Sequence, residues 1–134
     1  GTQYFIKPIS FTNENSQVKL DITFRYKDEI KDSATISFSI LGKTVLKKIN
    51  HFNISSGQNK IPLHKINLLF NEKRKDLITS RFSGKVLLKD LHELFKSTPW
   101  EVQVNSPTLN SKYTSSKKAN KVISTLQENV FVIF

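Results

Sequence analysis

Apolar and polar residues alternate strictly through two neighbouring stretches of the chain, 18–26 and 34–40. A period of two is typical of a β-strand that buries one face, because successive side chains point to opposite sides of the strand. The charged connection between the stretches, 27–33, predicts that they pair as an antiparallel hairpin. The apolar face of this hairpin is formed by Val18, Leu20, Ile22, Phe24, Tyr26, Ala34, Ile36, Phe38 and Ile40.

The opposite face of the predicted hairpin differs between its two strands. The first strand presents mostly charged residues there, whereas the second presents Thr35, Ser37 and Ser39. Charged side chains on a sheet discourage unwanted pairing and docking. The uncharged hydroxyl face of the second strand is therefore a candidate docking surface.

Other segments are predicted as strands from shorter alternating or apolar runs. Pro8 indicates that the first of them lies at a sheet edge, because proline cannot donate to a ladder. The last is apolar on both faces, which predicts a place inside a sheet. These segments are 4–11, 42–54, 76–86, 100–104 and 129–134.

Two segments carry helical periodicity. Leucines and a phenylalanine form one stripe over 87–98, and Pro99 ends the pattern. A second, shorter helix is predicted over 119–127. The segment 61–70 fits a strand or a helix, since Leu63, Ile66 and Phe70 would share one helical face.

The length of 134 residues fits one domain, 1–134. Its polar run 105–118 is too long for a tight turn and predicts a flexible loop. The pattern predicts a mainly β fold, an antiparallel β-sandwich of immunoglobulin-like or transthyretin-like type with one or two short helices. The alternative is an α+β fold with helices on an antiparallel sheet.

The net charge of +10 is concentrated in two segments. Residues 41–75 hold eight basic residues and one acidic residue (+7), and residues 105–134 hold four and one (+3). Clustered lysines near an aromatic ring can neutralise phosphates and stack on bases. The candidate anion-binding or partner-binding residues are Lys43, Lys47, Lys48, Lys73, Arg74, Lys75, Lys112, Tyr113, Lys117 and Lys118.

Nucleic acid is not the favoured partner, although these residues make it an alternative. The chain has 18 Lys and 3 Arg among its 21 basic residues, whereas base and phosphate recognition relies heavily on arginine. Lys, Asn and Ile all have A/T-rich codons, so an A/T-rich genome accounts for much of the lysine. No pattern typical of a nucleic-acid-binding motif is present.

Few features of the sequence support a catalytic or metal-binding site. The histidines His51, His64 and His92 lack metal-ligand spacing, and the chain has no Cys. The acidic group in 28–32 could hold calcium, but lysines interleave it and EF-hand spacing is absent. We therefore predict no catalytic residue, no cofactor and no metal, and a protein that is not an enzyme.

Because the chain has no Met, we expect a processed or trimmed piece, and we favour a removed export signal over a domain boundary or a deleted linker. No run of about 18 apolar residues is present in the chain shown. The leading hypothesis is a non-enzymatic, exported bacterial β-sandwich module, in one form a lipoprotein, that binds a protein or glycan at the cell surface or in the periplasm. A cytoplasmic location stays open. The alternative is a basic module for nucleic acid or anionic membrane, acting through 43–75.

Overall fold

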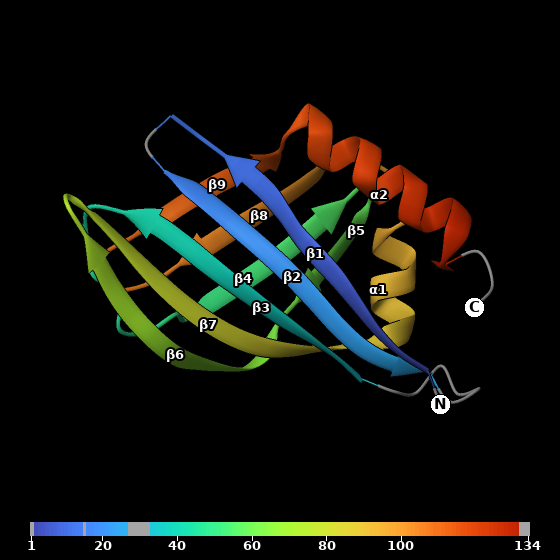
Figure 1. Ribbon diagram of the computed structural model, residues 1–134, viewed down its shortest axis with the longest axis horizontal. Helices are drawn as coiled ribbons and strands as arrows, with labels where there is room; N and C mark the ends of the chain where they lie inside the picture. The colour runs from blue at the N-terminus through green and yellow to red at the C-terminus, as the bar shows by residue number, and fades with distance from the viewer. Residues whose placement is uncertain (1, 15, 27–32, 132–134) are drawn as a thin grey trace.

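Residues 2–14, 16–26 and 33–131 are described by a computed structural model (Figure 1). Nine strands and two helices follow one another along the chain. The strands are β1 (Thr2–Thr12), β2 (Gln17–Tyr26), β3 (Ser33–Gly42), β4 (His51–Ser56), β5 (Asn59–Pro62), β6 (His64–Arg74), β7 (Leu77–Leu87), β8 (Trp100–Asn105) and β9 (Asn110–Ser115). The helices are α1 (Leu88–Leu94) and α2 (Lys117–Asn129).

All nine strands belong to one antiparallel sheet with the order β5-β4-β8-β9-β1-β2-β3-β7-β6. The sheet curls into a half-barrel, in which β1, β2, β3, β7 and β6 cross in front of β4, β5, β8 and β9 (Figure 1). The mainly β class with short helices is confirmed. The finer prediction of an immunoglobulin-like or transthyretin-like sandwich is not confirmed.

The hairpin predicted from the alternating stretches is confirmed. Strands β2 and β3 pair antiparallel, with Leu20 opposite Phe38 and Ile22 opposite Ile36. These four side chains are fully buried. The connection between the strands, including the acidic group considered for calcium, lies outside the described residues.

Strand β1 departs from simple alternation. Its register against β2 shifts between Ile6 and Ile9, so Ile6 and Ile9 are both buried while Phe5 is 65% exposed. Pro8 lies within this irregularity. On its other side β1 pairs with β9 at Phe11 and Thr12, and α2 packs against β1 next to that short pairing (Figure 1). The expected edge position of this strand is therefore wrong where β1 pairs with β9, and Pro8 lies outside that pairing.

Of three further segments, one takes the strand that was among its two alternatives, and two differ from the prediction. The segment 61–70 is extended in β5 and β6, so its helical spacing is incidental. The predicted flexible loop 105–118 instead contains β9 and the first residues of α2. The expected strand 129–134 is wrong over its described part, because α2 ends at Asn129 and Phe131 packs on Phe95 with ring centroids 4.0 Å apart.

The core lies inside the curl. Phe38 stacks between Phe52 and Phe82, with ring centroids 3.8 and 5.5 Å away. The predicted helix at 87–98 is confirmed as α1, which lies at one end of the curl (Figure 1). There the indole N–H of Trp100 donates to the Leu94 carbonyl oxygen at 2.9 Å, which satisfies the only polar atom of a fully buried ring.

The predicted helix at 119–127 is confirmed as α2. Ser116 is its N-cap, and its hydroxyl accepts a hydrogen bond from the Ala119 backbone N–H at 3.0 Å. Ala119 and Ile123 are buried. Within the described residues, neither helix is long and apolar enough to cross a membrane.

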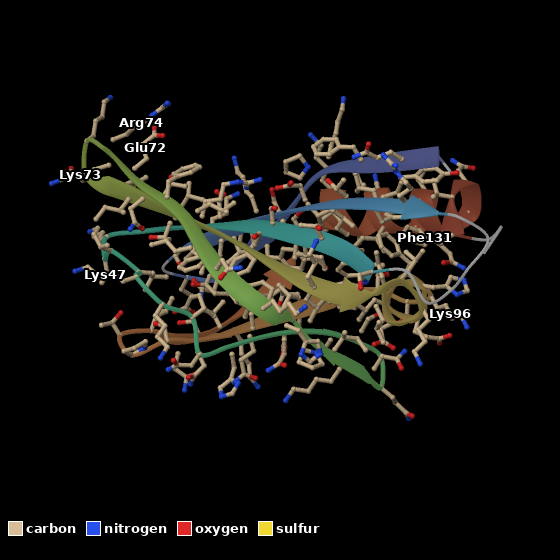
Figure 2. The ribbon with its side chains drawn as sticks, turned by 90° about the horizontal axis from the view of Figure 1, so that it is seen from below. Lys47, Glu72, Lys73, Arg74, Lys96 and Phe131 are labelled. Atoms are coloured by element: carbon tan, nitrogen blue, oxygen red, sulfur yellow. The ribbon has the colours of Figure 1, made fainter. Side chains whose placement is uncertain are left out.

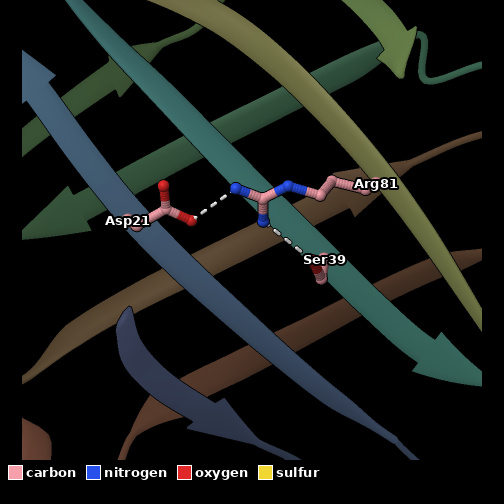
Figure 3. A network of polar contacts seen from close by, with 3 residues as sticks. All are labelled: Asp21, Ser39 and Arg81. Atoms are coloured by element: carbon pink, nitrogen blue, oxygen red, sulfur yellow. Dashed lines mark hydrogen bonds and ion pairs between the residues drawn. The ribbon is translucent and has the colours of Figure 1, made fainter. Parts of the chain in front are cut away.

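The polar contacts of one arginine link three strands on the outer face of the sheet. Arg81 of β7 reaches across β3, donating to the Ser39 hydroxyl at 3.0 Å and to the Asp21 carboxylate of β2 at 2.9 Å (Figure 3). The side chains of Arg81 and Asp21 are 26% and 11% exposed. Partial burial strengthens the attraction between the charges and penalises the loss of either partner.

Candidate binding surfaces

Strand β6 forms one edge of the sheet. Within the described chain it pairs with β7 alone, and almost all of its residues are exposed. An edge strand presents backbone N–H and C=O groups on its outer side that can template another strand. The other edge, β5, spans Asn59–Pro62 and ends in proline, so it offers a much shorter template.

Three consecutive apolar residues lie in the middle of β6. Leu68, Leu69 and Phe70 are 40%, 51% and 45% exposed. Leu68 is opposite the buried Phe82, so it faces the inside of the curl, whereas Phe70 is opposite Arg81 on the outer face. The register shift between Leu68 and Phe70 places Leu69 in a bulge. Both faces of this edge are therefore apolar at its centre.

Positive charge flanks this apolar stretch on both sides. Lys65 precedes it at a second register shift, with a φ of 53°. Lys73 and Arg74 end β6, and Lys75 lies in the turn to β7. The acidic residue of the strand, Glu72, is paired with Arg74. We call residues 65–75 the β6 edge.

The structure gathers several of the predicted basic residues at one end of the molecule. Lys43, Lys47 and Lys48 lie on the connection from β3 to β4 and are exposed. Lys47 lies at the same end as Lys73 and Arg74, opposite the end that holds Lys96 and Phe131 (Figure 2). This is the end of the curl where β3 finishes opposite β7, and we call it the open end.

The other predicted binding residues lie in different settings. Tyr113 is 1% exposed and its hydroxyl hydrogen-bonds the Ser16 hydroxyl at 2.7 Å, so its ring has no free face for a base. Lys112 is exposed, 4.0 Å from Glu101. Lys117 and Lys118 are exposed in the first turn of α2, which packs against β1. These lysines come from β9 and α2, whereas those of the open end come from the β3–β4 connection and the end of β6.

The hydroxyl face of β3 that was predicted for docking carries positive charges supplied by a neighbouring strand. Arg81 contacts Ser39, and the Lys85 ammonium donates to the Thr35 hydroxyl. Both cations come from β7, which pairs with β3 on the side away from β2. The two positive charges of β7 therefore discourage docking on this face.

The three histidines lie on three different elements. His51 begins β4 and His64 begins β6, and both are exposed, while His92 is half-buried on α1. Over residues 2–14, 16–26 and 33–131, no group of three or more His, Cys, Asp or Glu side chains could hold a metal ion.

Sequence reasoning missed the apolar centre of the β6 edge. The signal was present as three large apolar residues in a row within a lysine-rich segment. The run fitted either a strand or a helix, and neither assignment indicates an exposed apolar surface, because apolar runs are usually buried.

Comparison with protein-family models, with curated proteins and with solved structures finds no match.

Proposed function

We propose that this protein is a non-enzymatic binding module whose β6 edge adds an extended segment of another protein to the sheet. The observation that carries the proposal is an 11-residue edge strand with an exposed apolar centre. Strand addition obtains affinity from main-chain hydrogen bonds and selectivity from side-chain contacts. This keeps the protein partner of the leading sequence hypothesis, and an exported bacterial setting remains part of the proposal.

Charge complementarity defines the partner. The β6 edge carries Lys65, Lys73, Arg74 and Lys75 against one acidic residue, which Arg74 already neutralises. A second copy of the chain would bring like charges together along both strands, which opposes self-pairing. The segment that fits best has apolar residues at its centre and Asp or Glu at its ends.

A synthetic peptide with Val and Ile at its centre and Asp and Glu at both ends tests this proposal. We expect it to bind the protein, as measured by fluorescence anisotropy, and to bind less tightly at high salt. Leu69→Glu with Phe70→Glu should weaken binding about tenfold or more, because it removes apolar contact and adds repulsion. Both side chains are about half exposed, so the variant should fold normally.

Two controls make this experiment decisive. Val122→Glu changes an apolar residue of similar exposure, 38%, on α2 and should leave binding unchanged. The same peptide with Lys in place of Asp and Glu should not bind. Equal binding of both peptides, or no effect of the β6 substitutions, would contradict the proposal.

A second candidate function is binding of nucleic acid or an anionic membrane through the lysine-rich 43–75 segment. The observation that favours it is the gathering of Lys47, Lys73 and Arg74 at the open end (Figure 2). Binding to a single-stranded oligonucleotide or to phosphatidylserine vesicles should then fall steeply with salt and weaken in Lys47→Gln with Lys73→Gln. No binding at low salt rules this function out.

A further inference from the structure

The inner face of the sheet ends in small residues at the open end. Large apolar side chains alternate inward along β2 and β3 as far as Val18 and Ile40. Two residues further on are Ser16, which directly precedes β2, and Gly42, which ends β3. A Cβ built on Gly42 would lie 3.9 Å from the Ser16 Cβ, so these two positions face each other. The large apolar side chains of the core therefore end before the sheet reaches the open end.

A cavity of about 300 Å³ occupies the space that these small residues leave. Its size is at the low end of the range of small-molecule sites. Ile40, Leu46 and Leu109 supply its apolar lining. Of these, Ile40 and Leu46 are 3% exposed and belong to the core. An apolar group that enters the cavity thus meets a preformed apolar surface.

The charge among the polar residues that line this cavity is positive. Among the described residues that line it, Lys43 is charged, and Ser16, Thr44 and Thr108 offer hydroxyls. No acidic residue is among them. Lys43 is exposed, so its ammonium can meet a ligand at the mouth without a large desolvation cost.

Hydrogen bonds fix two walls of the cavity. The Ser16 hydroxyl is held by the hydroxyl of the buried Tyr113 at 2.7 Å. The backbone N–H of Leu46 donates to the Ser80 hydroxyl at 3.2 Å, which ties the connection after β3 to β7. A site whose walls are already fixed loses little conformational entropy when a ligand binds.

We infer that the cavity binds a small amphipathic carboxylate, a short to medium alkyl chain with one carboxyl group. The alkyl chain lies against Ile40, Leu46 and Leu109, and the carboxylate lies at the mouth beside Lys43. The positive charge of the open end favours an anion over a neutral molecule of the same shape. This site is separate from the β6 edge and does not depend on the function proposed for it.

Octanoate is the probe for this site, with 1-octanol as the neutral molecule of equal chain length. Titration calorimetry should show saturable octanoate binding and weaker octanol binding. Lys43→Gln should weaken octanoate binding about fivefold and leave octanol binding unchanged. Lys60→Gln, which removes an exposed lysine that does not line the cavity, is the matched control and should have no effect.

Gly42→Val tests the location of the site. Gly42 does not have a positive φ, and a Cβ there would make only an ordinary contact with the Ser16 Cβ at 3.9 Å, so valine fits the strand. The variant should keep its melting temperature and lose octanoate and octanol binding together, because its side chain fills the cavity. Absence of octanoate binding to the wild type, equal affinity for octanol, or undiminished binding to folded Gly42→Val would each overturn the inference.

Discussion

The ion pair between Asp21 and Arg81 should contribute measurably to stability. Arg81→Met keeps the apolar stem of the side chain but leaves the Asp21 carboxylate, 11% exposed, without its cationic partner. Fully exposed pairs contribute about 0–1 kcal/mol, and removing one partner of a fully buried pair costs about 3–5 kcal/mol. With side chains 26% and 11% exposed, we expect Arg81→Met to cost about 2.5 kcal/mol.

Replacing Asp21 instead of Arg81 should cost less stability. In Asp21→Ala the more exposed Arg81 can turn toward solvent, so we expect a loss of about 1 kcal/mol. The double variant should lose about 1.5 kcal/mol, because no unpaired charge remains. The sum of the single losses minus the double loss gives a coupling energy of about 2 kcal/mol.

Urea unfolding followed by circular dichroism measures all four proteins of this cycle. For a domain of this size, a loss of about 2.5 kcal/mol in Arg81→Met should lower the melting temperature by roughly 8 °C. A coupling energy below about 0.5 kcal/mol would refute the reasoning, since that value is typical of a solvent-screened pair. Ser37→Ala, on the same face, is the control and should change stability little.

Two further predictions concern local structure. Ser116→Ala removes the N-cap of α2 and should cost about 1 kcal/mol, whereas Ser116→Asp should preserve stability, as urea unfolding can verify. Gly84→Ala should destabilise the protein, because its Cβ would lie 2.8 Å from Leu63 Cδ2, while Gly42→Ala, with 3.9 Å to its nearest neighbour, should be neutral or stabilising. Equal melting temperatures for these two glycine variants would contradict the packing described here.

The buried strands and helices were predictable because the spacing of their apolar side chains indicates which face of each element is covered. The β2–β3 hairpin, β8 and both helices all follow from a period of two or of about 3.6 residues. Strand β9 was missed because its residues are mostly polar and Tyr113 is its one large inward side chain. A polar strand in the middle of a sheet is held by its neighbours, and its own sequence carries little signal.

The candidate surfaces were harder to predict. Residues of the β6 edge are exposed on both faces, so no alternation marks it as a strand, and bulges near Lys65 and Leu69 further disturb the pattern. The lysines at the open end were proposed from their charge alone, and the grouping of Lys47 with Lys73 and Arg74 depends on the curl of the sheet. Ser16 and Gly42 continue the register of β2 against β3, so their facing each other depends on that pairing and not on either stretch alone.

Amide hydrogen exchange of β6 tests the central claim most directly. In the free protein, no described strand pairs with the outward N–H groups of β6, so these amides should exchange quickly. On addition of the peptide with Val and Ile at its centre and Asp and Glu at its ends, we expect alternate amides from Ile66 to Lys73 to become protected, with little change in β5. Protection that appears elsewhere in the sheet, or none in β6 at saturating peptide, would contradict the account.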